Sequence, residues 1–280
     1  MKLATIRTDV GVTRAVRLSA DGASLIDLGA SDIGELLAHA GWEERAHSAD
    51  GQSYPAETAD FAPVVPVPSK VICVGHNYRN HIAEMGREVP EYPTLFTKFA
   101  DTLIGAYDDI EKPSETDALD WEVELVVVIG KPVRRATAAQ AEAAIAGFTV
   151  MNDVSVRDWQ FRTIEWTQGK IWDSSTPVGP FLTTPDELDG GTRPSLRVTT
   201  TVDGETMQDD NTGTLIFDPI KLVQYVSTIT RLRPGDLIAT GTPAGVGHAR
   251  SPKTYLLGGE TVEVEIAGLG SCKNTIVKSS

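Results

Sequence analysis

Short apolar runs separated by turn residues open the chain, and this pattern predicts β-strands. Three such runs lie at residues 3–6, 13–18 and 24–28. A short helix is predicted over residues 32–40, because Gly41 ends the pattern there. The polar stretch 43–60 is expected to be irregular. The beginning of the chain is therefore interpreted as a small β-rich unit.

Three prolines mark the end of this unit. Pro63, Pro66 and Pro68 stand within one short segment and stiffen the backbone. We therefore predict a small N-terminal domain over residues 1–68 and a larger domain over residues 69–280. A chain of 280 residues has room for this arrangement or for one large domain.

The larger domain combines long apolar strands with few helices. The segment WEVELVVVI at 121–129 is rich in β-branched residues, and FTVMND at 148–153 forms a second apolar strand. A helix is predicted between them over 137–146, opened by the capping box of Thr137 and Gln140.

Further along the chain the alternating pattern returns. The segment LRVTTTVDGETM predicts a hairpin that turns at Asp203-Gly204, and a helix over 218–230 begins with Pro219 at its first position. Together these elements predict a mixed α/β fold in which strands dominate.

Composition narrows the classes of function. Hydrophobic residues make up 41% of the chain and charged residues 23%, which is typical of a packed globular protein. The net charge of −14 and the lack of a basic stretch argue against nucleic acid as a partner. No apolar run reaches the roughly 18–20 residues of a membrane helix.

Two features favour the cytoplasm. The start MKLATIRTDVG shows no signal-peptide pattern. Cys73 and Cys272 lack the spacing of a zinc or redox pair and are expected to be buried free thiols. Free thiols are typical of a reducing compartment.

The strongest chemical signal is a pair of glutamates in the first long strand. Residues two apart in a strand share a face, so Glu122 and Glu124 project together from an apolar segment. Buried side by side, their carboxylates would repel each other and lose hydration, and a cation removes both penalties. Asp153, at the end of the second strand, can complete a set of hard oxygen ligands. The competing interpretation is a solvent-exposed edge strand with no ion.

Two further signals concern a base and a cation. His81 and Glu84 are neighbours if their segment is helical, and Glu84 would then orient the imidazole as a general base. Lys170, flanked by glycine and aromatic residues, can offer positive charge to a carboxylate or an enolate. An ordinary exposed pair and a surface lysine would show the same patterns.

The glycine-rich segment GTPAGVG at 241–247 argues against a nucleotide site. It lacks the Lys-Ser/Thr ending of a P-loop and the spacing of a dinucleotide fingerprint. Its backbone N–H groups and the Thr242 hydroxyl can still contact a ligand.

Seven segments, taken in order, resemble the fumarylacetoacetate hydrolase family. They are VGHNYRNHIAEMG, LFTKFADTLIG, DWEVELVVVIGK, GFTVMNDVSVRDWQ, GKIWDSSTPVGPF, RLRPGDLIATGTPAGVG and GGETVEVEIAGLG. The resemblance runs from about Val71 to Val277. It implies a twisted β-roll core of mixed sheets in a homodimer, with residues 1–68 as the variable N-terminal domain of many members.

The resemblance also implies roles for individual residues. The family's acidic metal triad corresponds to Glu122, Glu124 and Asp153, and the expected ion is Mg²⁺ or Mn²⁺, with Ca²⁺ able to replace it in a crystal. The other implied residues are the catalytic His81, Glu84 and Lys170 and the substrate-binding Gln160, Thr242 and His76. Relatives often carry other residues at the position of His76, so this contact departs from the family pattern.

The activity implied is hydrolysis of a carbon–carbon bond in a small 2,4-dioxo acid, of the acylpyruvate or fumarylpyruvate type, through a metal-stabilised enolate. The ion would offset the repulsion between an anionic substrate and an acidic protein. Decarboxylation of oxaloacetate and isomerisation of 2-hydroxyhepta-2,4-diene-1,7-dioate are alternatives on the same site. A non-catalytic metal or metabolite binder is an alternative of another class, and the intact His81–Glu84 pair and Lys170 argue against it.

Overall fold

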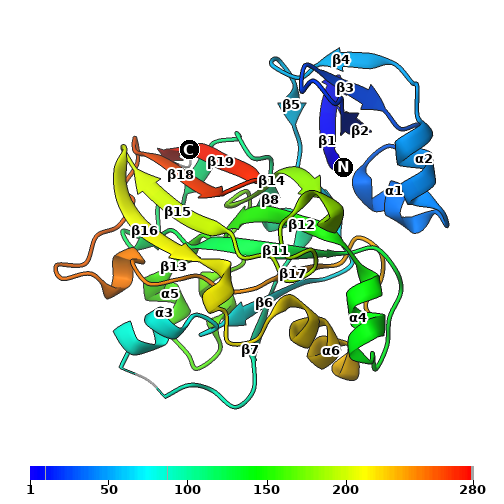
Figure 1. Cartoon of the computed structure of the whole chain (residues 1–280). Coiled ribbons are helices and arrows are strands. Elements are labelled where there is room, and N and C mark those ends of the chain that lie inside the picture. The colour runs from blue at the N-terminus through cyan, green and yellow to red at the C-terminus, as the bar shows by residue number, and fades with distance from the viewer. Residues whose placement is uncertain (10, 87, 279–280) are drawn as a thin grey trace.

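Two β-sheets dominate the computed structural model, which describes residues 1–9, 11–86 and 88–278 (Figure 1). The path of the larger sheet is β4 (Ser53–Pro55), β3 (Ser24–Asp27), β2 (Val12–Leu18), β1 (Lys2–Asp9), β14 (Thr176–Thr183), β12 (Ile145–Asn152), β11 (Val123–Ile129), β17 (Leu237–Ala239), β6 (Val71–Gly75) and β7 (Thr94–Lys98). Off this path, β5 (Asp60–Phe61) pairs with β1, and β8 (Leu103–Ile104) pairs with β14.

The second sheet has five strands, in the order β16 (Glu205–Asn211), β15 (Arg197–Val202), β18 (Thr261–Ile266), β19 (Gly270–Lys278) and β9 (Ile110–Lys112). A two-stranded sheet joins β10 (Leu119–Asp120) to β13 (Ser155–Val156). Strands pair in both directions, since β11 runs antiparallel to β12 whereas β17 runs parallel to β6. The predicted strand-rich, mixed α/β class is therefore confirmed.

Six α-helices lie at the margins of the described sheets (Figure 1). They are α1 (Ile33–Ala38), α2 (Trp42–Ser48), α3 (Arg79–Glu84), α4 (Ala138–Ala144), α5 (Arg157–Gln160) and α6 (Pro219–Ile229). None of the helices in these described ranges is long and apolar enough to cross a membrane.

Strand β11 is buried on both faces, which explains its unbroken apolar sequence. Leu125 and Val127 belong to the core shared with the second sheet, whereas Val126 and Val128 belong to a core on the opposite face. Central strands covered on both sides need apolar residues at every position. Glu124 is the exception, and its charge must therefore be compensated inside the protein.

The N-terminal segment continues the larger sheet. Strand β1 pairs with β14, with Leu3 opposite Leu182, and Leu3 packs in the same core as Val126. Thr5 holds parts of residues 1–68 together, since its hydroxyl donates to the Val64 carbonyl and accepts from the Ile33 amide. The division into domains 1–68 and 69–280 stays a prediction.

Several local predictions agree with the structure. Strands β15 and β16 form the predicted hairpin about Asp203-Gly204, and the capping box of Thr137 and Gln140 opens α4. Helix α6 begins at Pro219 as predicted. Cys73 and Cys272 are buried free thiols.

Two local predictions were wrong. Helix α2 lies in the stretch expected to be irregular, because Trp42 and Ala46, four residues apart, reach the core. Helix α4 ends at Ala144, and Gly147 lies inside β12, where a Cβ atom would come within 2.2 Å of the Thr183 carbonyl oxygen.

Replacing Asp218 by alanine should destabilise the protein by about 1 kcal/mol, because the carboxylate accepts a hydrogen bond from the Lys221 amide at the start of α6. Equilibrium unfolding in urea measures the change. Asp189→Ala, at an exposed turn outside the helices and strands, is the matched control and should have little effect. Equal midpoints for the two variants would contradict the capping role.

Candidate metal centre and active site

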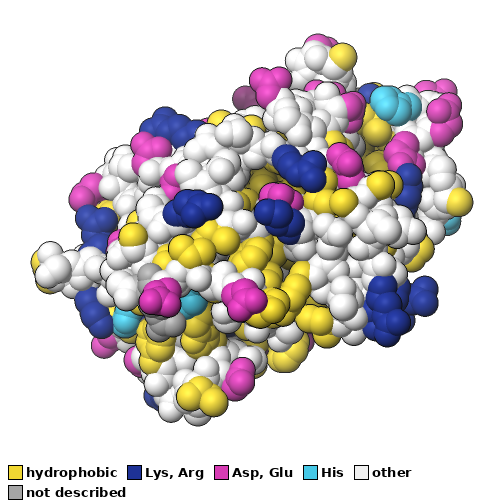
Figure 2. Space-filling view, turned by 60° about the horizontal axis from the view of Figure 1, so that its bottom comes forward, with side chains coloured by type: hydrophobic (Ala, Val, Ile, Leu, Met, Phe, Trp, Pro, Cys, Tyr) yellow, Lys and Arg dark blue, Asp and Glu magenta, His cyan; other side chains and the backbone are white. Residues whose placement is uncertain are grey.

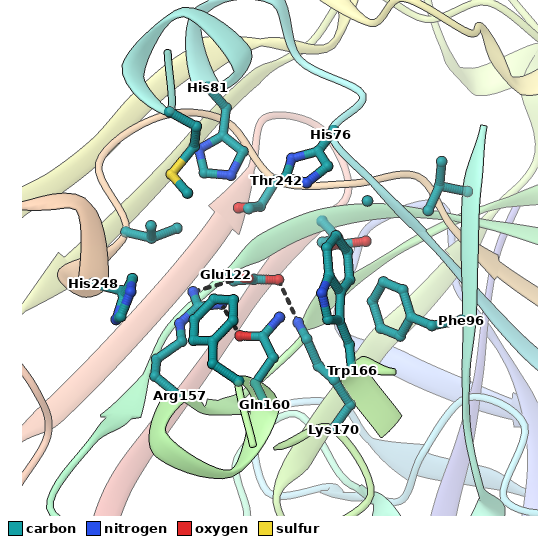
Figure 3. A pocket seen from close by; sticks show the side chains of 16 residues that line it. His76, His81, Phe96, Glu122, Arg157, Gln160, Trp166, Lys170, Thr242 and His248 are labelled. Atoms are coloured by element: carbon teal, nitrogen blue, oxygen red, sulfur yellow. Dashed lines mark hydrogen bonds and ion pairs between the residues drawn. The ribbon is translucent and has the colours of Figure 1, made fainter. Parts of the chain in front are cut away.

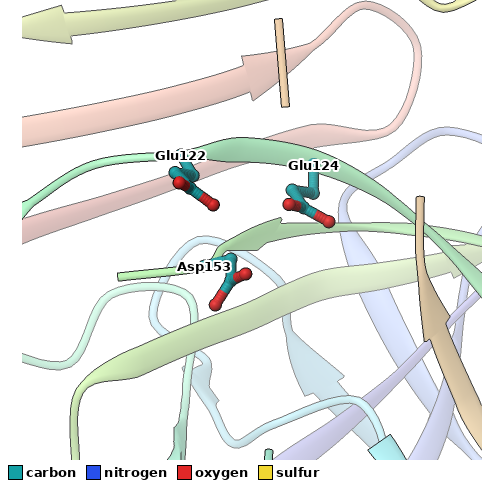
Figure 4. A group of neighbouring side chains, drawn as sticks. All are labelled: Glu122, Glu124 and Asp153. Carbon is teal, nitrogen blue, oxygen red and sulfur yellow. The ribbon is translucent and has the colours of Figure 1, made fainter. Parts of the chain in front are cut away.

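Three buried carboxylates meet where β11 and β12 lie side by side (Figure 4). The Asp153 amide donates to the Glu122 carbonyl at 2.9 Å, which places the two residues opposite each other. Oxygens of Glu122, Glu124 and Asp153 all lie within 4.8 Å of one another. The residues are 7%, 1% and 0% exposed, so the alternative of a solvent-exposed edge strand is excluded.

Buried cations pair with two of the three carboxylates. The Lys170 ammonium lies 2.7 Å from Glu122 Oε2 and 2.8 Å from Asp153 Oδ2. Lys98 Nζ lies 2.8 Å from Asp153 Oδ1, and Arg157 Nη2 lies 2.7 Å from Glu122 Oε1. Charge-assisted contacts of this length compensate the negative charge of both carboxylates.

Glu124 is in a different environment. Its Oε2 accepts a hydrogen bond from the Gly241 amide at 2.8 Å, and within the described ranges no lysine or arginine forms an ion pair with it. Burial, and then the negative charges of Asp153 and Glu122, raise the pKa of Glu124 well above its usual value. Burial also acts to raise the pKa of Glu122, but the charges of Lys170 and Arg157 outweigh it and lower that pKa to about 2.

This charge distribution fits a divalent ion. Asp120 also pairs with Arg157, at 2.7 Å, so these four carboxylates face the three cations Lys98, Lys170 and Arg157. With all four ionised, one negative charge is left without a partner, and the raised pKa of Glu124 indicates that this carboxylate is the least favourable of them to ionise without a metal. Carboxylate oxygens are the ligands that Mg²⁺ and Mn²⁺ prefer. A bound divalent ion would convert the excess negative charge into an excess positive one, which suits an anionic ligand.

The predicted His81–Glu84 pair forms in helix α3. His81 Nδ1 lies 3.0 Å from Glu84 Oε2, and Glu84 Oε1 accepts from the Gly245 amide at 3.1 Å. Glu84 therefore holds the imidazole by one nitrogen and leaves Nε2 to face the pocket. Asn80 anchors the same helix, because its side chain bonds to Asp210 and accepts from the Ala244 amide.

A single pocket joins the carboxylates to the histidine (Figure 3). Phe96 and Trp166 form an apolar wall on one side, and His248 lies on the other, with Glu122 between them. The pocket is lined by Val74, Gly75, His76, His81, Met85, Phe96, Glu122, Glu124, Arg157, Gln160, Phe161, Trp166, Lys170, Thr242, Val246 and His248.

The residues predicted to bind substrate line this pocket, and their neighbours orient them. Gln160 Oε1 accepts from Arg157 Nη1 at 2.9 Å, so its amide NH₂ is left to donate. Thr242 Oγ1 accepts from Gln208 Nε2 at 2.9 Å, which leaves its hydroxyl hydrogen to donate. Both side chains therefore present donors suited to an oxygen-rich ligand.

His76 lines the pocket beside Trp166 and adopts a left-handed backbone conformation, with φ of 57°. Its ring meets Trp166 edge-on at 5.1 Å between centroids. Gly75 allows this packing, because a Cβ atom there would lie 2.3 Å from the Trp166 ring.

Sequence reasoning missed several site residues. Lys98 ends an otherwise uncharged strand, and Arg157 stands three residues before Gln160 in a helix, so both offered a weak signal. His248 also lines the pocket, and its Nδ1 lies 2.9 Å from the Tyr255 hydroxyl. Nothing in the local sequence indicates that these two residues meet.

A family model confirms what the motifs indicated. The model described as Fumarylacetoacetate (FAA) hydrolase C-terminal matches residues 70–277, which is most of the chain. The chain belongs to the fumarylacetoacetate hydrolase family. Members of this family are enzymes, and they include hydrolases, isomerases and oxaloacetate tautomerases.

Relatives of the family are similar in sequence and in structure. The mitochondrial oxaloacetate tautomerase FAHD2A of Bos taurus is 43% identical over 225 residues, covering 80% of this chain and 71% of that protein. The fumarylacetoacetate hydrolase of psychrophilic Exiguobacterium antarcticum is 31% identical, with a TM-score of 0.87 and full coverage of both chains. The 5-carboxymethyl-2-hydroxymuconate delta-isomerase of Mycobacterium smegmatis is 32% identical, with a TM-score of 0.82 and full coverage of both chains.

Substitutions at the two glutamates should change stability in opposite directions when no metal is bound. Glu124→Gln removes an uncompensated buried charge and should raise the urea midpoint at neutral pH. Glu122→Gln takes one counterion from Lys170 and Arg157 and should lower stability by about 3 kcal/mol. Midpoints that move in the same direction would refute this charge distribution.

The difference in stability between the two variants should depend on pH. The depressed pKa of Glu122 stabilises the fold above its usual value of 4.5, and this contribution is lost as pH falls toward about 2. The raised pKa of Glu124 destabilises the metal-free fold as pH rises through that pKa. The gain in stability from Glu124→Gln should therefore be large near about pH 8 and shrink near about pH 5.

Glu124→Gln should also lose the rise in urea midpoint that we expect Mg²⁺ to give the unmodified protein.

Proposed function

We propose that this chain is a divalent-metal-dependent enzyme that moves a proton on a small 2-oxo acid, with oxaloacetate tautomerisation as its reaction. The single observation that carries the proposal is that His81, oriented by Glu84, lines one pocket together with Glu122 and Glu124 of the buried carboxylate triad. The 43% identity to an oxaloacetate tautomerase supports the choice of reaction.

Mg²⁺ or Mn²⁺ held by Glu122, Glu124 and Asp153 would supply Lewis-acid polarisation of the 2-oxo group. His81 would act through Nε2, removing a proton from the carbon next to the keto group and returning it to the oxygen of the resulting enolate, which gives the enol. Glu84 stabilises the charged imidazole between these two transfers. No water is consumed, because the proton only changes its position on the substrate.

Lys170 and the two neutral donors hold the substrate. The Lys170 ammonium is fixed by Glu122 and Asp153, so its positive charge stays beside the pocket as negative charge develops on the enolate. The amide of Gln160 and the hydroxyl of Thr242 are oriented to bind the substrate's oxygens. The homodimer and the cytoplasmic location expected from the sequence stay predictions.

A second candidate is hydrolysis of a 2,4-dioxo acid of the acylpyruvate or fumarylpyruvate type. The same His81–Glu84 pair favours it, because a base held in this way can also take a proton from water. Water would add to the second carbonyl, and the carbon–carbon bond would break to release a carboxylate and pyruvate. The choice between the two reactions depends on whether water reaches that carbonyl.

A panel of substrates separates the candidates. Oxaloacetate, acetylpyruvate, fumarylpyruvate and 2-hydroxyhepta-2,4-diene-1,7-dioate are each assayed with Mg²⁺ and with a chelator. We expect the enol absorbance of oxaloacetate to relax fastest, without formation of pyruvate. Release of acetate and pyruvate from acetylpyruvate at a higher kcat/KM would favour hydrolysis instead. Activity that survives thorough chelation would refute the metal-dependent scheme.

His81→Ala should lower kcat for the preferred substrate by about 10²–10⁴-fold, because it removes the general base. The rise in thermal midpoint caused by Mg²⁺ should persist, since the carboxylates remain. His39→Ala, at an exposed position in the N-terminal segment, is the control and should keep full activity. A kcat for His81→Ala within threefold of the unmodified enzyme would remove His81 from the reaction.

A further inference from the structure

We propose that His248, backed by Lys253 and Tyr255, forms a subsite for a second carboxylate at the far end of the substrate. This inference rests on the proposed function and names the substrate class of that site, a 2-oxo dicarboxylic acid. It concerns residues beyond the triad, the His81–Glu84 pair and the other residues that the family resemblance implies.

The pocket has two chemically different ends (Figure 3). Phe96 and Trp166 line one end, with their ring centroids 5.6 Å apart, and His76 packs edge-on against Trp166. The Lys170 ammonium lies 5.0 Å from the Phe96 ring centroid, but it is already paired with Glu122 and Asp153. His248 lies at the other end, beyond Glu122 and Arg157. A substrate with its 2-oxo acid head at the triad extends its tail toward one of these ends. A charged tail needs a polar partner outside the ion pairs of the triad, because leaving water without one is unfavourable, and His248 offers such a partner.

His248 is held in place by contacts on several sides. Its Nδ1 lies 2.9 Å from the Tyr255 hydroxyl, and its backbone amide donates to Asp120 Oδ2 at 2.9 Å. The ring of Phe161 covers one face, at 5.0 Å between centroids. A side chain fixed in this way loses little freedom when it binds a ligand.

Positive charge gathers at the same end. The Lys253 ammonium lies 3.4 Å from His248 Nε2, at the limit of a hydrogen bond. The Lys253 ammonium donates to Nε2 when the imidazole carries its hydrogen on Nδ1 and donates it to the Tyr255 hydroxyl. A carboxylate that replaces this long contact accepts from Lys253, and it accepts from Nε2 as well once the hydrogen moves there and the Tyr255 hydroxyl donates to Nδ1.

The nearby carboxylate does not cancel this charge. Asp120 accepts hydrogen bonds from Arg157 Nε at 2.7 Å and from the amides of Gly247 and His248. The Asp120 side chain is fully buried, and these donors compensate its negative charge. In a chain of net charge −14, a local pair of donors such as His248 and Lys253 is what an incoming dianion requires.

Oxaloacetate and acetylpyruvate test the subsite, because they share the 2-oxo acid head. The tail of oxaloacetate is a carboxylate, whereas the tail of acetylpyruvate is a neutral acetyl group. His248→Ala should raise KM for oxaloacetate about tenfold while kcat changes less than threefold, since a lost charge-assisted contact of this size weakens binding by about that factor. Selectivity for oxaloacetate over acetylpyruvate should fall by the same factor. His248→Gln, which keeps a donor, should recover part of it.

Lys253→Gln is a second variant and should also reduce selectivity for oxaloacetate. Lys253 is exposed, so the substitution should not impair folding. His39→Ala is the matched control and should leave selectivity unchanged. The subsite would be overturned if His248→Ala and Lys253→Gln each changed the KM values for oxaloacetate and acetylpyruvate equally, or changed neither of them.

Calorimetry on the Mg²⁺-loaded protein separates the subsite from the reaction. Tighter binding of oxaloacetate than of acetylpyruvate, lost in His248→Ala, supports the subsite even if neither compound is turned over, in which case the proposed function alone fails. If oxaloacetate is turned over but His248→Ala leaves its affinity unchanged, the subsite alone fails.

Discussion

The burial of three carboxylates within a few ångströms of one another is the constraint on which the rest of the site depends. Carboxylates removed from water repel each other, and the fold holds them together only by surrounding them with positive charge. Lys98 and Lys170 do this from β7 and from the segment after α5, two elements far apart in the sequence. Glu124 has no lysine or arginine partner among the described residues, and this makes the centre suited to a divalent ion.

One network of contacts joins this centre to the walls of the pocket. Asp120 binds the Arg157 guanidinium, which also pairs with Glu122. The Asp120 carboxylate further accepts from the amides of Gly247 and His248 at the end of the glycine-rich loop, so it anchors both helix α5 and this loop. Glu84 joins helix α3 to the same loop through the Gly245 amide. The base and the carboxylates are therefore positioned by a common scaffold, as catalysis by orientation requires.

In the proposed function, the head of the pocket and its far end have different tasks. The triad and the oriented histidine would act on the 2-oxo acid head, and relatives named as a tautomerase, an isomerase and a hydrolase belong to the same family. The choice of substrate then depends on the side chains that meet the tail. In this chain those include Phe161 and His248, which lie outside the family's motif residues for metal and base.

The sequence alone determined the strand-rich class, the capped helices and the family, because alternation, capping residues and ordered motifs are local properties of the chain. It also placed Glu122 and Glu124 on one face, because strand geometry requires it. Only the tertiary structure decided that Asp153 lies opposite Glu122, that Lys98 and Arg157 compensate the site, and that Tyr255 meets His248. These contacts join segments that are distant in sequence, and local patterns carry no information about which distant segments the packing of the core brings together.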